Sequence, residues 1–150
     1  MNILVVDDEP SYRMLLEHFL KDQGWTVCTA SNGEEGLKKL RETKIDFIIS
    51  DVYMPIMDGI KFQKAIHAIP EFAQIPFLFV SAFDDDYTME AVRSSKYIGF
   101  MKKAKPVEEL KEWIDYLTSP IDKRRIIPPG AEQKVVRNVR HERSDDKYRW

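Results

Sequence analysis

Carboxylate, hydroxyl and amino side chains follow four short apolar runs of the sequence, each at the point where its run ends. Asp7 and Asp8 follow the first run, Asp51 the third, Ser81 the fourth and Lys103 the fifth. Where three carboxylates converge, their mutual repulsion raises their pKa values unless a cation neutralises them. An all-oxygen set without cysteine or histidine nearby favours a hard divalent ion, and magnesium fits it better than zinc. The set therefore predicts a magnesium site.

Ser81 and Lys103 indicate which anion would bind beside such a metal. A phosphoryl group needs metal, ammonium and hydroxyl donors together as charge develops on its oxygens. Taken singly each signal is weak, since an acidic pair after a strand more often caps a helix and a lone lysine usually faces solvent. Their joint occurrence at the ends of four strands predicts a site that handles a phosphoryl group.

Five apolar runs alternate with five segments of helical periodicity, and these elements must position the site. The predicted strands span 3–6, 26–30, 46–50, 76–80 and 98–101, and the predicted helices span 10–23, 33–41, 59–68, 87–95 and 106–117. The connections are too long for hairpins, so they indicate right-handed crossovers and a parallel sheet covered on both faces. The predicted fold class is doubly wound α/β, in which ligands bind at the carboxyl ends of the strands.

The charge of the chain divides it into two parts. Residues 1–118 carry 14 Lys and Arg against 20 Asp and Glu, whereas residues 119–150 carry 9 against 5. We interpret 1–118 as one domain and 119–150 as a basic C-terminal extension, partly disordered with one short helix. The extension is too short for a helix-turn-helix output domain, which argues against sequence-specific binding of nucleic acid.

The cysteine content and the first residues bear on where the protein works. Cys28 is the one cysteine, which suits a reducing compartment and excludes a disulfide framework. The opening MNILVVDD has four consecutive apolar residues before two acids, too few for a signal peptide or a membrane span. We predict a cytoplasmic protein with no membrane partner.

Three motifs within residues 1–118 resemble the receiver domain of two-component response regulators. Residues 5–10, Val-Val-Asp-Asp-Glu-Pro, look like the acidic opening of that family. Residues 50–59, from Ser-Asp-Val-Tyr-Met-Pro to Met-Asp-Gly, look like its phosphoacceptor loop, and Val80-Ser81-Ala82 looks like its hydroxyl-bearing strand. The resemblance implies a flavodoxin-like fold of five parallel strands and five helices, as in stand-alone, CheY-like receivers.

Carried over residue by residue, the resemblance gives each polar side chain a role. Asp51 would be the nucleophile, modified to 4-aspartylphosphate, and a metal ligand. Asp8 would be a direct Mg²⁺ ligand, Asp7 an acidic neighbour acting largely through water, and the Tyr53 carbonyl a third protein ligand. Ser81 would bond a phosphoryl oxygen and take part in the switch.

The active-site lysine has two candidates, Lys103 and Lys105. Lys105 is followed by proline, as in many family members, whereas Lys103 has an aromatic residue, Phe100, three places before it. We prefer Lys103, because Leu110 then falls seven positions later and the interval from Ser81 needs no insertion. Phe100 would be the aromatic residue that rotates in the switch; the alternative is a core phenylalanine on a strand.

The implied protein is a phosphoacceptor in a phosphorelay and not an enzyme acting on a separate substrate. A sensor histidine kinase or a phosphotransfer protein would phosphorylate Asp51, with Mg²⁺-dependent self-phosphorylation and self-dephosphorylation. Phosphorylation would remodel the face built from the fourth helix, fifth strand and fifth helix. A downstream protein, or a second copy of the chain in a homodimer, would bind that face.

Two rival interpretations share part of this pattern. A haloacid-dehalogenase-like phosphatase also uses a strand-end aspartate and magnesium, but it needs a second aspartate where this chain has Tyr53. An unphosphorylated pseudo-receiver would keep the fold as an interaction module, and Ala104 in place of the family's proline leaves that alternative open.

Overall fold

Five strands form one parallel sheet in the computed structural model, which describes residues 1–130. The strands are β1 (Asn2–Val6), β2 (Thr26–Ala30), β3 (Phe47–Ser50), β4 (Phe77–Ser81) and β5 (Ile98–Lys102). Their order in the sheet is β2-β1-β3-β4-β5. The order reverses between β1 and β3, which places a ligand-binding crevice at the carboxyl ends of these two strands. The predicted doubly wound α/β class is confirmed.

Five α-helices connect and follow the strands. They are α1 (Pro10–Asp22), α2 (Gly33–Glu42), α3 (Gly59–His67), α4 (Asp86–Arg93) and α5 (Glu109–Thr118). The side chains of Asn32, Asp58 and Asp85 cap α2, α3 and α4, since each accepts a hydrogen bond from a backbone N–H three residues later. Within residues 1–130, no helix has the length and apolar character needed to cross a membrane.

The predicted start of the fifth helix is wrong. We expected Pro106, but α5 begins at Glu109. The N–H groups of Glu109 and Leu110 donate to the carbonyls of Pro106 and Val107, three residues earlier. These are 3₁₀ bonds, so the chain tightens before it enters the α-helix.

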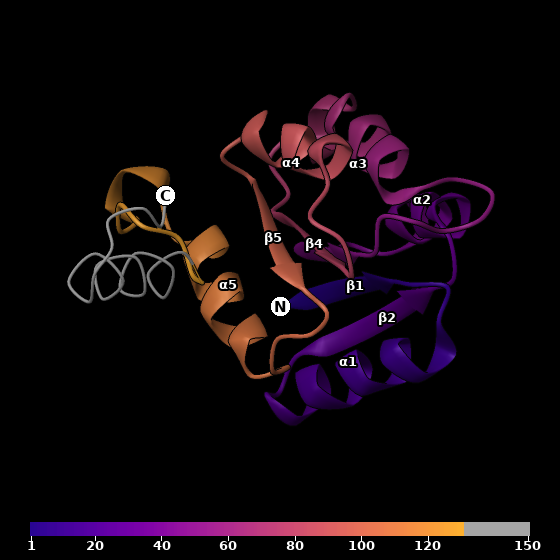
Figure 1. The fold of residues 1–150 in the computed structure, drawn as a ribbon. Helices are drawn as coiled ribbons and strands as arrows, with labels where there is room; N and C mark the ends of the chain where they lie inside the picture. Colours follow the sequence, from indigo (N-terminus) through magenta and orange to yellow (C-terminus); the bar gives the residue numbers. More distant parts are fainter. Residues whose placement is uncertain (131–150) are drawn as a thin grey trace.

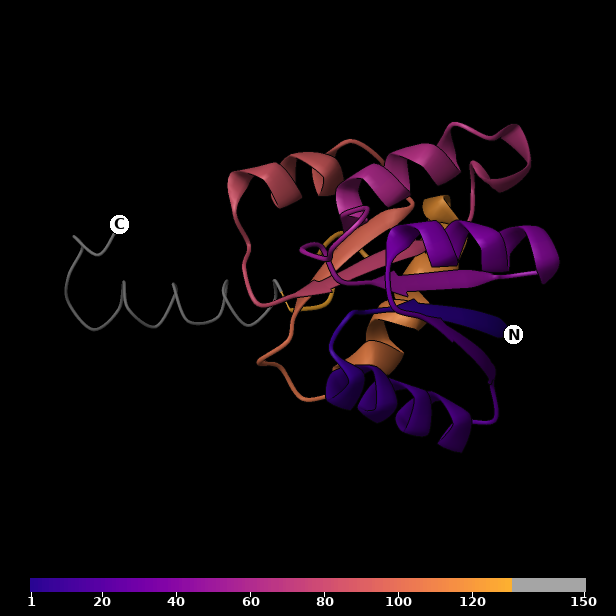
Figure 2. The same ribbon diagram turned by 90° about the vertical axis from the view of Figure 1, so that its right-hand side faces the viewer.

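The sheet separates two apolar cores (Figures 1 and 2). Helices α2, α3 and α4 cover one face, where Phe62, Phe77 and Phe79 are fully buried. Helices α1 and α5 cover the other face, where Leu16 and Trp113 are buried. Because both faces are covered, the strands are apolar throughout and the polar chemistry lies at their ends.

Strand pairing continues past the ends of β1 and β3 and fixes the first polar residues there. The Asp7 N–H donates to the Ala30 carbonyl at 3.1 Å, and the Asp51 N–H donates to the Val6 carbonyl at 2.9 Å. The backbones of Asp7 and Asp51 are therefore held side by side at the carboxyl edge of the sheet.

The chain continues beyond α5 as the first part of the C-terminal extension. It forms one 3₁₀ helix, η2 (Ile121–Lys123); a similar turn, η1 (Pro70–Phe72), follows α3. We predicted one short helix in the extension without giving its position, and we did not predict η1. Residues 131–150, and the partial disorder predicted for them, lie outside the described residues.

His67 ends α3 as a partly buried, neutral histidine. Its Nδ1 lies 2.9 Å from Gln63 Nε2, which can only donate, and its Nε2 lies 3.0 Å from the Ile75 carbonyl, which can only accept. These partners assign the neutral tautomer that carries its proton on Nε2. Burial lowers the pKa of His67, although the bond to the Ile75 carbonyl opposes this shift.

We expect His67 to make the fold less stable in mild acid. The unfolded chain binds a proton at His67 below about pH 6.5, before the folded protein does, so stability falls as the pH falls through this window. Urea unfolding at about pH 7.5 and about pH 5 should show a larger loss for the natural chain than for His67→Gln. The same replacement at the exposed His18 should leave that loss unchanged. Equal losses in the natural chain and His67→Gln would exclude His67 as the source.

Candidate functional site

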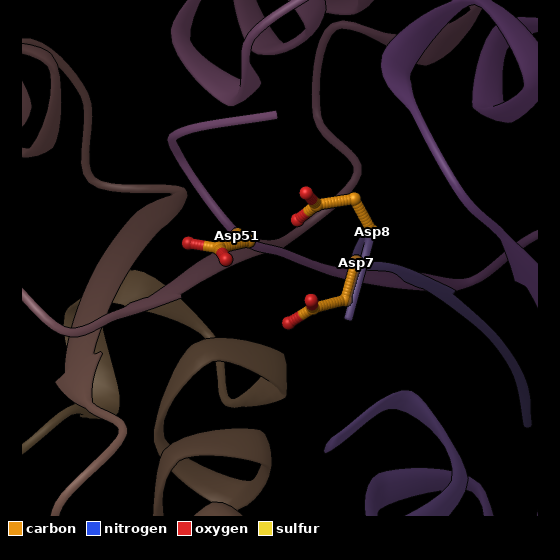
Figure 3. Close-up of side chains that lie close together, drawn as sticks. All are labelled: Asp7, Asp8 and Asp51. Atoms are coloured by element: carbon orange, nitrogen blue, oxygen red, sulfur yellow. The ribbon is translucent and has the colours of Figure 1, made fainter. Parts of the chain in front are cut away.

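Three carboxylates converge at the carboxyl edge of the sheet. Asp7 and Asp8 follow β1 and Asp51 follows β3, and one carboxylate oxygen from each lies within 4.8 Å of the others. Figure 3 shows the side chains of Asp7 and Asp8 beside that of Asp51. Asp7 is 2% exposed and Asp51 8% exposed, whereas Asp8 faces solvent. The structure thus forms an acidic cluster with one open side.

The loop after β3 holds the Asp51 carboxylate in place. The Val52 N–H donates to Asp51 Oδ1 at 2.7 Å. Gly59, the first residue of α3, packs so closely that a Cβ there would lie 2.0 Å from the Asp51 carbonyl oxygen. Between them, Ile56 has a φ of 72°, a left-handed conformation that is costly for a β-branched residue. The loop is therefore tightly folded against the backbone of Asp51.

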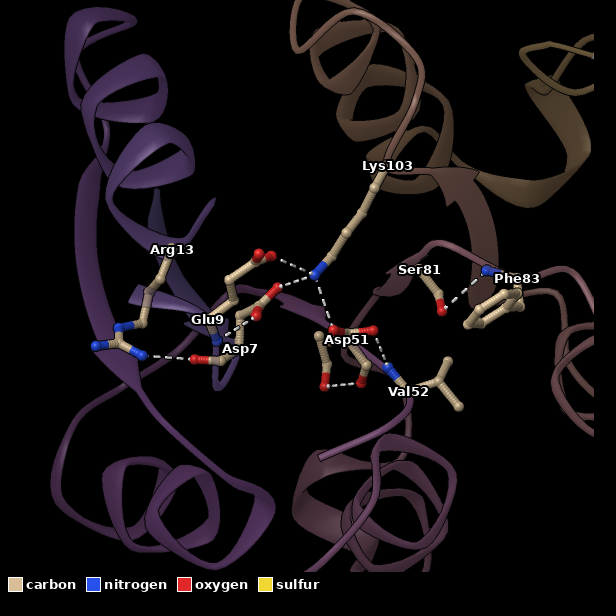
Figure 4. A network of polar contacts seen from close by, with 9 residues as sticks. Asp7, Glu9, Arg13, Asp51, Val52, Ser81, Phe83 and Lys103 are labelled. Atoms are coloured by element: carbon tan, nitrogen blue, oxygen red, sulfur yellow. Dashed lines mark hydrogen bonds and ion pairs between the residues drawn. The ribbon is translucent and has the colours of Figure 1, made fainter. Parts of the chain in front are cut away.

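Lys103 reaches from the end of β5 into the acidic cluster (Figure 4). Its Nζ lies 2.9 Å from Asp51 Oδ2, 3.0 Å from Asp7 Oδ2 and 3.3 Å from Glu9 Oε1. Burial by itself would lower the pKa of Lys103, but hydrogen bonds to Asp51 and Asp7 outweigh burial and raise it. Lys103 is therefore a cation at neutral pH, with its charge directly beside Asp51.

Glu9 and Tyr12 also contact Lys103, and the sequence did not single them out. Glu9 belongs to the acidic opening motif, so its presence at the site had a signal. The ring of Tyr12 lies beneath Lys103 Nζ, 4.7 Å from ring centroid to nitrogen, within cation–π range. Burial raises the pKa of Tyr12 to about 12. No spacing indicates this contact, because Tyr12 and Lys103 come from opposite ends of the domain.

The two predicted switch residues lie on neighbouring strands. Ser81 ends β4 and is 1% exposed, and the Phe83 N–H lies 3.4 Å from its Oγ (Figure 4). The Ser81 carbonyl accepts the Lys103 N–H at 2.9 Å, so the serine and the lysine share one strand pairing. Phe100 lies on β5 opposite Phe79, half-buried against the core. Its place suits both the switch and the core interpretations.

Two tyrosine–aspartate hydrogen bonds join the loop after β3 to the start of α4. The Tyr53 hydroxyl donates to Asp85, and the Tyr87 hydroxyl donates to Asp58 Oδ2 at 3.1 Å. The ring of Tyr53 also meets Phe83 edge to face, with centroids 6.3 Å apart. These contacts tie the loop that follows Asp51 to the segment that follows Ser81.

The donor set of the acidic cluster fits a hard divalent cation. Burial is the largest influence on Asp7 and raises its pKa, although the Glu9 N–H and Lys103 act in the opposite direction. A cation at the open side, where Asp8 meets solvent, would offset this cost of burying charge. The cluster offers carboxylate oxygens without sulfur or ring nitrogen, which favours magnesium over softer metals.

Comparison with known protein families shows to which family the chain belongs. Residues 3–115 match the response regulator receiver domain. The chain belongs to the response regulator receiver family. The receiver is 36% identical over 124 residues to the alkaline phosphatase synthesis transcriptional regulatory protein of Bacillus subtilis, over 83% of this chain and 44% of that protein. It is 32% identical over 126 residues to the chemotaxis protein CheV3 of Helicobacter pylori, over 75% of this chain and 40% of that protein. The chain spans less than half the length of these two relatives.

Solved receiver structures share the fold of this receiver. The receiver domain of a signal transduction histidine kinase from Syntrophus aciditrophicus has a TM-score of 0.72 at 27% identity, covering 86% of this chain and 98% of that one. A response regulator from Thermotoga maritima, solved in complex with Mg²⁺-BeF, has a TM-score of 0.66 at 32% identity, covering 77% and 97%. The predicted family is confirmed, and with it the place of this chain among the receivers of two-component phosphorelay signalling.

Proposed function

We propose that Asp51 is the phosphoacceptor of this receiver and that its phosphorylation controls a protein partner. The observation that carries the proposal is the setting of the Asp51 carboxylate. It is buried, held by the Val52 N–H, and paired with Lys103 at 2.9 Å, with Asp7 and Asp8 beside it. A nucleophile fixed in this way needs little reorganisation, and its surroundings can offset the charge of an incoming phosphoryl group.

The transfer would form a bond between an Asp51 carboxylate oxygen and phosphorus. The bond between phosphorus and the donor breaks at the same time, and the donor leaves with that electron pair. The donor would be the phosphohistidine of a sensor histidine kinase or phosphotransfer protein, or a small phosphodonor. Lys103, which stays protonated, would move from the carboxylates to a phosphoryl oxygen, and the Ser81 hydroxyl would donate to another.

Asp8, Asp51 and the Tyr53 carbonyl would hold Mg²⁺, with Asp7 acting through water. When bound, the ion supplies positive charge to the phosphoryl oxygens. The Thermotoga maritima relative, crystallised with Mg²⁺-BeF, supports this assignment, as do the three converging carboxylates.

The acyl phosphate would then bias a two-state equilibrium. The Ser81 hydroxyl and Phe100 would move toward the phosphorylated Asp51, which changes the face formed by α4, β5 and α5. A downstream protein, or a second copy of this chain, would bind the changed face. Water can attack the same phosphorus, so the receiver would also remove its own phosphoryl group.

Intact mass after incubation with Mg²⁺ and acetyl phosphate tests the proposal. We expect the natural chain to gain one phosphoryl group, and Asp51→Asn to gain none, because the amide cannot form the acyl phosphate. Removing Mg²⁺ with a chelator should also prevent the gain. Asp86→Asn, at an exposed carboxylate of α4, should react like the natural chain. If the natural chain gained no mass where a known receiver reacts, the pseudo-receiver would be the better interpretation.

We also infer the division of the chain and its location. The family match ends at residue 115, which supports a receiver over 1–118 followed by the basic extension over 119–150. The single cysteine supports the cytoplasm, where phosphorelay partners would meet the receiver.

A further inference from the structure

Arg124 fastens the beginning of the C-terminal extension to the domain. Its guanidinium group donates to three backbone carbonyls, those of Ser119 at 3.1 Å, Leu117 at 2.9 Å and Lys96. It also lies over the ring of Tyr116, 5.3 Å from the centroid. Such a set of contacts uses the planar fork of an arginine and holds the chain after α5 in one place.

The three carbonyls belong to two different elements. Those of Leu117 and Ser119 lie at the end of α5, where helix carbonyls lack partners and the helix dipole favours a cation. That of Lys96 lies in the turn between α4 and β5. Arg124 therefore links the end of α5 to the beginning of β5.

The segment held by Arg124 forms one wall of a groove between α4 and α5. The groove is lined on the domain side by Val92, Gly99 and Trp113, and on the extension side by Ile121 and Pro128. The indole of Trp113 packs on the backbone of β5, since a Cβ on Gly99 would lie 2.5 Å from its ring. Figure 1 shows the extension folded back beside α5. It lines the groove together with Ile98 and Gly99 of the edge strand β5. The extension therefore closes one side of a groove that lies beside the edge strand of the sheet.

Strand β5 connects this groove to the acidic cluster. It begins two residues after Lys96 and ends one residue before Lys103. Arg124 holds the chain at the beginning of the strand, and Asp51 and Asp7 hold Lys103 at its end. A single short strand therefore joins the carbonyl that Arg124 holds to the lysine of the acidic cluster.

We propose that residues 121–130, latched by Arg124, close one side of the groove between α4 and α5, and that phosphorylation of Asp51 releases them. The release rests on the proposed function, whereas the latch does not. A phosphoryl group on Asp51 draws Lys103 away from its carboxylate partners, and β5 carries the movement to the Lys96 carbonyl. Loss of that acceptor weakens the latch and uncovers the groove for a protein partner.

Trypsin cleavage of the native protein tests the latch without phosphorylation. Lys123 and Arg125 flank Arg124, and cleavage after either one requires the backbone that Arg124 holds to unfold locally. We expect Arg124→Gln to be cut at these two sites at least about tenfold faster than the natural chain. Lys111→Gln removes the same charge from an exposed position of α5. This control should be cut after Lys123 and Arg125 at the natural rate. Equal rates for Arg124→Gln and the natural chain would overturn the latch.

The release is tested on the natural chain with Mg²⁺ and acetyl phosphate. Where intact mass shows one added phosphoryl group, cleavage after Lys123 and Arg125 should also become at least about tenfold faster. Asp51→Asn should show neither change. Added mass with unchanged cleavage would overturn the release and leave the phosphoacceptor function intact. No added mass would overturn both the function and the release, and the Arg124→Gln result would still decide the latch.

Discussion

Lys103→Met should slow the phosphorylation of Asp51 by acetyl phosphate by at least about a hundredfold, the usual cost of removing a preorganised charge that faces the reacting group. The Lys103 ammonium lies 2.9 Å from Asp51 Oδ2 and stays protonated because Asp51 and Asp7 raise its pKa. Methionine has a similar length and no charge, so the variant removes the cation and keeps most of the packing against Tyr12.

Lys105→Met is the matched control, because it separates the two lysines that the sequence offered. The rate of phosphorylation, followed by intact mass, should stay within about threefold of the natural rate, as expected for a substitution outside the reacting groups. Calorimetric titration should show that Lys103→Met still binds Mg²⁺, since all three carboxylates are kept. A large loss of rate in Lys105→Met, with Lys103→Met near normal, would reverse the assignment of the active-site lysine.

Gly59→Ala should lower the free energy of unfolding by about 3 kcal/mol or more, at the upper end of what overpacking costs. Its Cβ would lie 2.0 Å from the Asp51 carbonyl oxygen and 2.9 Å from the Val52 Cα, and backbone atoms cannot turn aside. The Gly59 N–H also donates to the Val52 carbonyl at 2.7 Å, so α3 cannot retreat without losing this bond. Because the strain falls on Asp51, phosphorylation should slow as well.

Gly33→Ala is a close control for Gly59→Ala, since both glycines are the first residue of a helix after a capping side chain. A Cβ at Gly33 would meet the side chain of Met57, with its Cγ at 2.8 Å. A thioether chain can adopt another rotamer, so urea unfolding should show a loss of about 1 kcal/mol or less. Similar losses for the two variants would show that the backbone contact at Gly59 is not the cause.

Most of the fold could be predicted because the strands are short apolar runs bounded by polar residues. The first helix begins at Pro10, and α2 and α3 begin at Gly33 and Gly59, as proline, the turn residues and helical spacing predicted. The start of α5 was wrong because a 3₁₀ turn after Pro106 has the same apolar spacing over three residues as an α-helix. Backbone hydrogen bonds distinguish the two, and composition does not.

The residues of the site that directly follow a strand could be predicted from the sequence. Asp7, Asp51 and Ser81 lie at the carboxyl edge because the register of a parallel sheet places them there. Contacts made by long side chains were not predictable. The contact between the Tyr12 ring and Lys103 depends on how α1 packs on the sheet. The hydrogen bond from Arg124 to the Lys96 carbonyl depends on how the chain turns after α5. Neither geometry leaves a trace in the spacing of residues.

The positive charge that Lys103 brings into the acidic cluster affects whether the chain needs a metal ion in order to fold. Asp7 and Asp51 would repel each other in a folded chain that had no counterion of its own, and folding would then depend on an ion taken up from solution. Since Lys103 lies within 3.0 Å of both carboxylates, the counterion is built into the chain. The fold therefore does not need a metal to neutralise these two carboxylates, and an ion bound at the cluster would be exchangeable without unfolding the chain.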